Sequence, residues 1–283
     1  MKVVDTIPRM STLVKIFRKE GKSISLVPTM GYLHEGHASL IRAARKHTDV
    51  VVVSIFVNPV QFGPKEDFEK YPRDMKRDEA LATTAGADIV FAPSAKDMYP
   101  DGYSTYVNVE RLTDVLCGAS RPGHFKGVAT VVAKLFEIVR PEIAYFGQKD
   151  AQQAMVIKKM AADLNTGIEI KVLPIIRESD GLAMSSRNIY LSESERKDAL
   201  VLHEALKKAE AMIKSGEREA KKIIRAMKEL ISAIPSAKAD YISIVDITNL
   251  KGIKVLSGEV LVALAVFIGK TRLIDNILMK VEK

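Results

Sequence analysis

The sequence predicts an α/β protein, with a doubly wound parallel sheet followed by a smaller α+β domain. As far as Ile176, short apolar runs rich in β-branched residues alternate with segments whose apolar residues recur at helical spacing. The apolar runs lack the period-2 alternation of a half-exposed antiparallel strand, so we expect both faces of each strand to be covered. Strands and helices that alternate in this way form a parallel sheet with helices on both faces, which is a Rossmann-like arrangement.

The elements of this sheet can be predicted one after another along the chain. Residues 24–28 are a short apolar run that ends in proline, and residues 49–57 are nearly all apolar, so both are predicted strands. Residues 36–47 repeat small or apolar side chains at helical spacing and predict a helix. A helix at 74–85 is expected to end at Gly86. The remaining predicted elements are helices at 127–139 and 149–164 and strands at 87–92, 143–146 and 168–176.

The character of the sequence changes after Ile176. The stretch "RESDGLAMSSRNIYLSESERK" is polar and has no periodic apolar pattern, so it is predicted to be a linker that carries functional residues. Ser192 and Glu195 form a capping-box pattern that starts the next helix. Helices at 193–214 and 217–233 follow, and then strands at 240–246 and 260–268. We therefore predict two domains, residues 1–178 and residues 179–283, with the second acting as a lid.

Composition favours a soluble globular protein. The chain has 283 residues, of which 47% are hydrophobic and 28% are charged, and such values are typical of folded domains. Cys117 is the one cysteine, which excludes an intrachain disulfide and favours a reducing, cytoplasmic location. No stretch has the features of a secretion signal, and no apolar run approaches the ~20 residues that cross a bilayer.

The net charge of +8 raises the alternative of nucleic-acid binding. Much of the excess lies at residues 207–228, where lysines are interleaved with glutamates at helical spacing, which is typical of a solvated helix face. A basic protein also suits anionic small molecules. No RNA-binding motif, aromatic interleaving or tryptophan supports the nucleic-acid alternative.

The stretch "GYLHEGH" follows the first predicted strand and contains two of the five histidines. Ligands of an open parallel sheet bind at the carboxyl ends of its strands, and the N-terminus of the next helix attracts phosphate. His34 and His37 point the same way in a helical turn, and Gly36 lets a ligand approach the backbone. The pattern therefore predicts phosphate binding. A zinc site would need further ligands or a zincin spacing, and an ordinary polar helix start remains an alternative.

Two further strand ends carry polar residues. Asn58 and Gln61 follow the "VVVVSIF" strand and suit hydroxyl or carboxylate recognition, although Asn-Pro is also a turn former. Lys149 and Asp150 follow the "EIAYFG" strand and suit phosphate and a ribose hydroxyl. The alternative at this second position is a helix cap with a solvated lysine.

The polar linker contains Met184-Ser185-Ser186-Arg187. Two hydroxyls and one guanidinium form a natural phosphate clamp. On a flexible segment these groups could close over ATP and reopen for product release. An exposed linker without a ligand is the alternative.

Taken together, these motifs resemble the "HIGH" and "KMSKS" pair of the nucleotidyltransferase superfamily. The stretches "PTMGYLHEGHASLIRAA", "SIFVNPVQFGPKEDFEKYPR", "RPGHFKGVATVVAKLF", "YFGQKDAQQ" and "DGLAMSSRN" are similar, in order and spacing, to the pantothenate synthetase (pantoate–β-alanine ligase) family. The similarity runs from Val27 to Tyr190 and is looser in the last third. The KMSKS lysine is replaced by Ser-Ser-Arg, which departs from the synthetase pattern and agrees with the pantothenate one.

The resemblance implies an ATP-dependent ligase of pantothenate biosynthesis. ATP would adenylate the carboxylate of (R)-pantoate and release pyrophosphate, and the amine of β-alanine would then displace AMP. The implied cofactors are ATP and Mg²⁺, and the implied partners are the two small substrates and a second copy of the chain, without nucleic acid or membrane. No covalent nucleophile is needed, so Cys117 is expected to be a small core residue. Another nucleotidyltransferase stays an alternative, although Asn58, Gln61 and the Gln152-Gln153 pair favour pantoate over a phosphorylated acceptor.

The resemblance also implies roles for individual residues. His34, His37, Lys149 and Arg187 would act catalytically. Nucleotide contacts would come from Met30, Gly31, Tyr32, Leu33, His34, Glu35, Gly36, His37, Gly147, Gln148, Lys149, Asp150, Ile176, Met184, Ser185, Ser186 and Arg187. Pantoate contacts would come from Pro28, Met30, Asn58, Gln61 and Gln153, with Arg121 and His124 as secondary contacts. Asp78 lies where the family can place a metal-linked acid, but the metal ligands stay unassigned.

Overall fold

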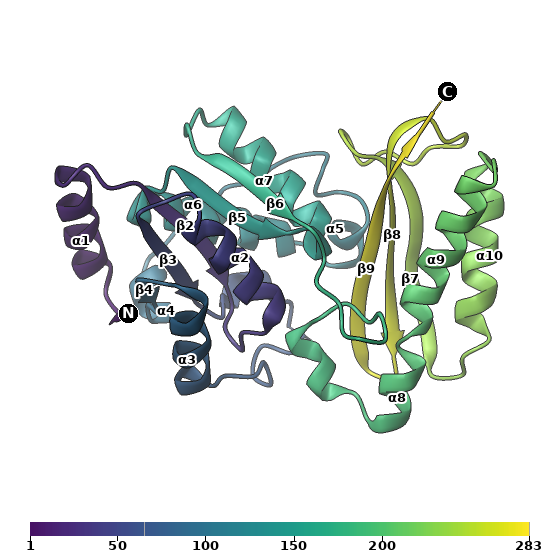
Figure 1. Ribbon diagram of the computed structural model, residues 1–283, viewed down its shortest axis with the longest axis horizontal. Helices are drawn as coiled ribbons and strands as arrows, with labels where there is room; N and C mark the ends of the chain where they lie inside the picture. Colours follow the sequence, from purple (N-terminus) through teal and green to yellow (C-terminus); the bar gives the residue numbers. More distant parts are fainter. Residues whose placement is uncertain (65, 283) are drawn as a thin grey trace. The chain divides into compact units, whose positions relative to one another are not determined.

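A computed structural model describes residues 1–64 and 66–282, and the chain divides into two compact units (Figure 1). Unit 1 comprises Met1–Glu110, Arg121–Gln148 and Gln153–Pro174. Unit 2 comprises Arg111–Ser120, Lys149–Gln152 and the described chain from Ile175 onward. The second unit therefore begins near the predicted boundary at residue 178, and it also takes up two earlier segments.

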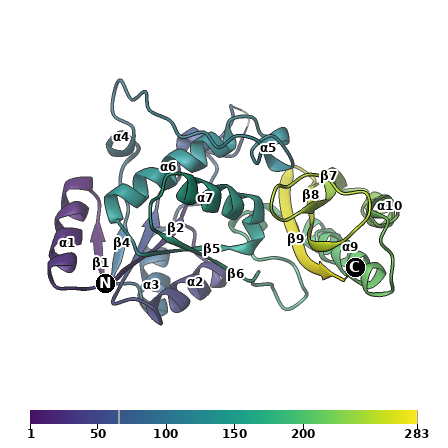
Figure 2. The same ribbon diagram turned by 90° about the horizontal axis from the view of Figure 1, so that it is seen from above.

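Unit 1 is built on a parallel sheet of six strands in the order β1-β4-β3-β2-β5-β6. Every residue of β3 is buried, as expected of a strand covered on both faces. Figure 2 shows α6 and α7 on one side of the sheet and α2 and α3 on the other. The predicted doubly wound fold is confirmed. The strands are β1 Lys2–Val4, β2 Ile24–Thr29, β3 Val50–Ile55, β4 Ile89–Phe91, β5 Ile143–Gly147 and β6 Glu169–Leu173.

The helices of unit 1 include one that the sequence prediction missed. Helix α1 (Ile7–Lys19) buries Met10 and Val14, and it precedes the first predicted strand. The predicted end of a helix at Gly86 is confirmed, because this glycine adopts a left-handed conformation with φ of 100°. The remaining helices are α2 Glu35–Arg45, α3 Met75–Ala85, α4 Ala95–Met98, α6 His124–Val139 and α7 Ala151–Asp163, with short 3₁₀ turns η1 Pro59–Gln61 and η2 Gln148–Asp150. Lys149–Gln152, which span the end of η2 and the start of α7, belong to unit 2.

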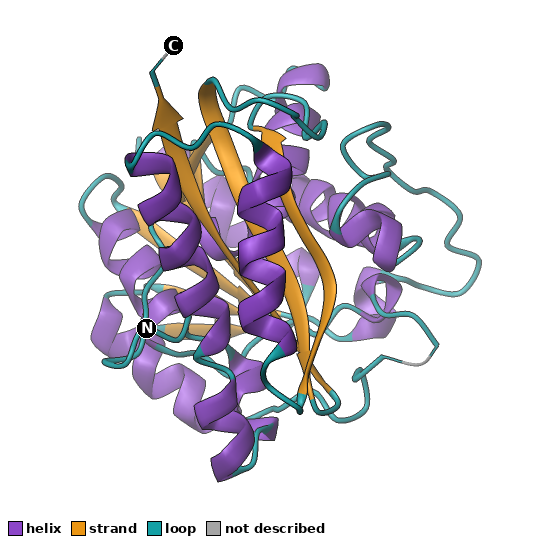
Figure 3. Ribbon diagram, turned by 90° about the vertical axis from the view of Figure 1, so that its right-hand side faces the viewer, coloured by secondary structure: helices purple, strands orange, loops and turns teal. Residues whose placement is uncertain are grey.

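Unit 2 contains an antiparallel sheet of three strands in the order β7-β8-β9. Helices α9 and α10 cover one face of this sheet (Figures 1 and 3). The prediction had two strands here and missed β9, which follows β8 through a tight turn. The capping box of Ser192 and Glu195 at the start of α8 is confirmed. The elements are α5 Cys117–Ser120, η3 Ser186–Tyr190, α8 Glu193–Asp198, α9 Val201–Lys214, α10 Ala220–Ser232, β7 Ala237–Asp246, β8 Gly258–Ile268 and β9 Thr271–Val281.

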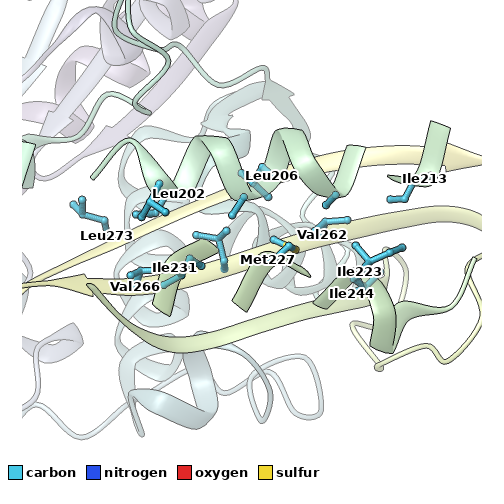
Figure 4. Close-up of a cluster of buried hydrophobic side chains, with 14 of the residues drawn as sticks. Leu202, Leu206, Ile213, Ile223, Met227, Ile231, Ile244, Val262, Val266 and Leu273 are labelled. Atoms are coloured by element: carbon cyan, nitrogen blue, oxygen red, sulfur yellow. The ribbon is translucent and has the colours of Figure 1, made fainter. Parts of the chain in front are cut away.

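Alternate residues of the three-stranded sheet have different surroundings. Val262 and Val266 of β8 pack with Leu202 and Leu206 of α9 in a buried apolar cluster (Figure 4). The opposite face of the sheet contacts an earlier part of the chain, because the Tyr241 hydroxyl lies 3.2 Å from the buried Cys117 thiol. Cys117 is therefore a core residue of unit 2, as expected. Across the part of the chain that the structure describes, no helix is long and apolar enough to span a membrane.

Candidate active site

The predicted ligand loops of unit 1 lie where the strand order of the sheet reverses. The chain passes from β2 to β3 and β4 on one side, and it then continues with β5 and β6 on the other side of β2. The loops after β2 and β5 thus leave the carboxyl ends of two neighbouring strands at a topological switch point, which is where open α/β sheets bind ligands.

The two histidines of "HEGH" cap helix α2. His34 is the N-cap residue, and its Nδ1 accepts a hydrogen bond from the Gly36 backbone amide at 3.1 Å. The Nδ1 of His37 accepts one from the His34 amide at 3.2 Å, and the two ring centroids are 4.1 Å apart. This is a capping box in which imidazoles replace the usual hydroxyl and carboxylate.

The capping contacts decide which ring nitrogen carries a proton. An Nδ1 that accepts a backbone N–H must be unprotonated, so each neutral ring carries its proton on Nε2. Each imidazole therefore has an Nε2–H donor. Gly36 serves the same arrangement, because a Cβ at this position would lie 2.8 Å from the His34 ring. This is a second reason for the glycine, besides ligand approach.

Asp78 holds the loop between β2 and α2. Its carboxylate accepts hydrogen bonds from the amides of Tyr32 at 2.7 Å and Leu33 at 2.6 Å, and the residue is only 1% exposed. The loop needs such support because Gly31 has φ of 83° and Tyr32 has φ of 50°. Burial raises the pKa of the Asp78 carboxyl although the two amides favour its charged form. Asp78 is thus a loop-holding residue rather than a member of an acid cluster.

Asn58 and Gln61 meet in a buried polar cluster at the carboxyl end of β3. The Asn58 side chain, 1% exposed, donates to Gln61 Oε1 at 3.0 Å and to the Gly127 carbonyl at 3.1 Å, and it accepts from the Tyr99 hydroxyl at 2.9 Å. Because its oxygen is held by Asn58, Gln61 turns its amide nitrogen to Met30 Sδ at 3.2 Å. The turn that the sequence offered as the alternative at Asn58 is also present, since Asn58 caps η1. The sequence prediction missed Tyr99, which has no motif near it.

Arg121 and His124 lie behind Gln61. Arg121 makes a bidentate ion pair with Glu66 at 2.7 and 2.5 Å and donates to His124 Nε2 at 3.1 Å. His124 Nε2 must then accept, so Nδ1 carries the proton and donates to the Gln61 carbonyl at 2.9 Å. Both residues therefore orient the backbone of Gln61.

The glutamine pair in α7 separates into two roles. Gln152 is buried, and its amide bonds the carbonyls of Leu112 and Val115 and the amide of Cys117. It holds the 111–120 segment, which does not match the substrate contact that the sequence favoured for the pair. Gln153 is half-buried and belongs to unit 1.

In unit 2, the predicted nucleotide residues form two turns. Lys149 lies in η2, with its ammonium 3.7 Å from the Asp150 carboxylate. Ile176 and Met184 are brought together by a hydrogen bond of 3.0 Å from the Met184 amide to the Ile176 carbonyl. Ser185 then caps η3 through the Arg187 amide. The segment predicted as a linker is thus a hydrogen-bonded hairpin followed by a 3₁₀ turn.

The predicted site residues divide between the two units. Unit 1 holds those from Pro28 to Gln61 together with Gly147, Gln148 and Gln153. Unit 2 holds Lys149, Asp150, Ile176 and those from Met184 to Arg187. Within residues 1–64 and 66–282, no group of three or more His, Cys, Asp or Glu side chains could hold a metal ion.

Comparison with known proteins gives a consistent result. The matching family model is described as pantoate-beta-alanine ligase and covers residues 2–278. A pantothenate synthetase of Moorella thermoacetica is 59% identical over 282 residues, covering 100% of both chains. Another, of Acetivibrio thermocellus, is 57% identical over 99% of this chain and 100% of its own.

Solved structures agree with the sequence relatives. Pantothenate synthetase from Thermus thermophilus has a TM-score of 0.93 at 44% identity, over 98% of this chain and 99% of that chain. Pantoate-beta-alanine ligase from Francisella tularensis, solved with beta-gamma ATP and beta-alanine, has a TM-score of 0.81 at 36% identity, over 98% of this chain and 97% of that chain.

Proposed function

The chain belongs to the pantoate–β-alanine ligase family, and from this premise we propose that it joins (R)-pantoate to β-alanine in an ATP-dependent reaction. The observation that carries the proposal is that the family match spans almost the whole chain and includes every candidate site segment. The product is pantothenate, with AMP and pyrophosphate released.

The reaction proceeds in two displacements. A carboxylate oxygen of pantoate attacks the α-phosphorus of ATP, and the bond from this phosphorus to the pyrophosphate oxygen breaks. The unprotonated amine of β-alanine then attacks the acyl carbon of the pantoyl adenylate, and the acyl–oxygen bond to AMP breaks as the amide forms. Neither step needs a covalent enzyme intermediate, so the residues position the reactants and stabilise charge.

His34 and His37 are proposed to bind the phosphates of ATP. Their Nδ1 atoms cap α2, and the Nε2–H of each ring can therefore donate to a phosphate oxygen. Negative charge grows on the departing pyrophosphate, and a donor placed there is typically worth a factor of about 10²–10³ in rate. The dipole of helix α2 adds to this attraction, while the His34 and Gly36 amides are already bonded to the two rings.

Gln61 and Gln153 are proposed to hold pantoate, together with Pro28 and Met30. The Asn58 amide fixes the Gln61 side chain so that its NH₂ group is the donor end. Carboxylate and hydroxyl oxygens of pantoate accept such hydrogen bonds. Asn58 itself is occupied by its protein contacts, so we assign it to shaping this pocket.

Residues of unit 2 are proposed to complete nucleotide binding. Lys149, Ser185, Ser186 and Arg187 offer the ammonium, hydroxyl and guanidinium groups that suit phosphate oxygens. Contacts to the nucleoside are assigned to Asp150 and the backbone of Ile176 in unit 2 and to Gly147 in unit 1. The C-terminal part of the chain would act as a lid that closes over ATP.

Mg²⁺ is proposed to arrive with ATP, held by phosphate oxygens and water. The described residues supply no cluster of three or more metal-ligating side chains. Asp78, the acid that the family resemblance suggested, already accepts hydrogen bonds from two backbone amides. The ion would neutralise part of the phosphate charge. The residues assigned above would make the remaining contacts to the phosphates and the nucleoside.

A cytoplasmic homodimer is the proposed working form. Light scattering of the purified protein at several concentrations measures the mass directly. A mass near that of one chain at all concentrations would rule out the dimer and leave the proposed activity untouched.

The activity is tested by pyrophosphate exchange into ATP with a panel of carboxylic acids. We expect (R)-pantoate to support exchange without β-alanine, and β-alanine to allow stoichiometric release of AMP. Exchange with other acids but not with pantoate would mean that the chain is a different adenylating enzyme. Tight, salt-dependent RNA binding without exchange would instead favour the nucleic-acid alternative.

A further inference from the structure

Strand β9 carries two adjacent polar residues that are deeply buried. Asp275 is 2% exposed and Asn276 is 3% exposed. Successive residues of a strand point to opposite faces of the sheet. Asp275 pairs across the ladder with Leu264, which belongs to the cluster under α9 and α10, whereas Asn276 pairs with Ala263 on the other face. Buried polar side chains in such a sheet require partners.

The partner of Asp275 is the hairpin that leads into the Ser185–Arg187 turn. Arg177 makes a bidentate ion pair with Asp275, with N–O distances of 2.6 and 3.0 Å, and donates to the Gly181 carbonyl at 3.0 Å. Arg177 also bridges to Ala183 across the hairpin. The base of the hairpin and its turn are thus tied to one carboxylate of β9.

The partner of Asn276 is the turn that contains Lys149. The Asn276 amide donates to the Lys149 carbonyl at 3.0 Å. The two β9 residues are themselves linked, because Asp275 Oδ1 accepts a hydrogen bond from the Asn276 backbone amide at 2.8 Å. Two segments that are far apart in the sequence are therefore fastened to opposite faces of one strand at neighbouring residues.

We propose that Asp275 and Asn276 are positioning residues that hold the Lys149 turn and the Ser185–Arg187 turn in register for binding the triphosphate. This inference rests on the proposed function, because it takes both turns as phosphate contacts. The proposed role requires no contact of either side chain with the nucleotide, because both act through the turns they hold. A buried ion pair can often be replaced by apolar residues without loss of stability, so we assign the Arg177–Asp275 pair to fixing geometry rather than to stability.

The test uses Asn276→Ala, Asp275→Asn and Arg177→Lys in the full-length protein. Asn249→Ala is the control, since it also removes an asparagine bond to the backbone, in this case one that Asn249 Oδ1 accepts from the Lys251 amide in the exposed turn after β7. Single-turnover formation of the adenylate is measured at saturating pantoate, with ATP titrated, and the melting temperature is recorded for each variant.

We expect Asn276→Ala and Asp275→Asn each to slow adenylate formation by about 10-fold or more, since small misplacements of binding groups cost this much. Arg177→Lys keeps the charge but not the bidentate geometry, so an intermediate rate is expected. Asn249→Ala should keep the wild-type rate. A purely structural role would lower the melting temperature and leave the rate per folded molecule unchanged, and that result would overturn the proposal.

Failure of the proposed function is distinguishable from failure of this inference. If the wild-type protein forms no adenylate with pantoate, the proposed activity is wrong, and stabilisation of the protein by ATP alone then serves as the readout. The wild type and Asn249→Ala should gain thermal stability from ATP, and Asn276→Ala should gain less. Equal gains in all three proteins would contradict the positioning role, and Asn276→Ala keeps this test open if Asp275→Asn does not fold.

Discussion

The two regions that we assign to phosphate binding are built in different ways. The loop before α2 in unit 1 is closed by the two histidines, each of which bonds a backbone amide two or three residues away. The hairpin before Ser185 in unit 2 is held by Arg177 and Asp275, which are 98 residues apart. The histidine cap forms with its own helix, although Asp78 of α3 also holds the preceding loop. The second arrangement requires the completed C-terminal sheet.

The largest effect should come from the local site. His37→Ala removes an Nε2–H donor and one half of the capping box, and we expect adenylate formation to fall by about 10²–10³-fold. The measurement is rapid-quench adenylate formation. His47→Ala is the control, because His47 is exposed and follows the end of the same helix. Equal rates for both variants would show that His37 makes no contribution to adenylate formation.

The long-range site should respond to a change at its turn. Gly181 has φ of 102°, and a Cβ there would lie 2.2 Å from the His203 ring of α9. Gly181→Ala should lower the free energy of unfolding by about 2–3 kcal/mol. Gly102→Ala shares the positive φ but has nothing within 4 Å, so about 1–2 kcal/mol of strain is expected. If urea titrations gave the same loss of unfolding free energy for Gly181→Ala and Gly102→Ala, the contact between α9 and the hairpin would not contribute to stability.

A substitution in the capping box tests the local site without removing a histidine. Gly36→Ala places a Cβ 2.8 Å from the His34 ring. We expect a loss of about 1 kcal/mol in stability, as for a lost N-cap, and a parallel fall in adenylate formation. Gly252→Ala is the control, since this glycine has open space around it. A normal rate of adenylate formation in Gly36→Ala would show that the capping geometry is not required for the reaction.

The smallest effect concerns the ion pair behind Gln61. Burial opposes the charged form of Glu66, but its bonds to Arg121 prevail and hold the pKa of this carboxyl below its ordinary value of 4.5. A lowered pKa stabilises the folded protein above pH 4.5, and this stabilisation disappears as the pH falls through the folded-state value. Glu66→Gln should therefore be less stable than wild type at neutral pH, and the difference should shrink in acid.

Denaturant titrations of both proteins across this range give the comparison. Glu229→Gln, which changes an exposed carboxyl of α10, is the control. If the free energy of unfolding differed between wild type and Glu66→Gln by the same amount at every pH, ionisation of Glu66 would make no contribution to stability.

The difference between local and long-range contacts also explains how much of the fold and the site could be predicted from the sequence. The parallel sheet and the histidine motif depend on local patterns, such as the apolar run of β3 and the spacing of His34 and His37, and the fold class was confirmed. Strand β9 was missed although it directly follows its partner strand β8, because the buried polar residues Asp275 and Asn276 interrupt its apolar pattern. No local signal marks Asp275 as the partner of Arg177.

Neighbouring residues of one type were equally hard to separate. Gln152 and Gln153 look alike in the sequence, but the side chain of Gln152 hydrogen-bonds to backbone groups of the 111–120 segment. Asp78 offered the opposite difficulty, since an acidic residue near a phosphate loop suggests a metal, whereas its oxygens bond two amides of a strained turn. In both cases the tertiary contacts decide the role.

The buried thiol of Cys117 gives unit 2 a built-in reporter. It is the one cysteine of the chain, and it lies against Tyr241 on the face of the sheet that also holds Lys149. The thiol contacts Tyr241 and Arg272 of the sheet, so we expect a thiol reagent to label it when the 111–120 segment moves away from the sheet, and the labelling rate then reports the frequency of that opening. The wild-type protein can therefore be followed by mass spectrometry, with and without ATP. The labelling rates show how often this part of unit 2 opens and how much ATP reduces the frequency of opening.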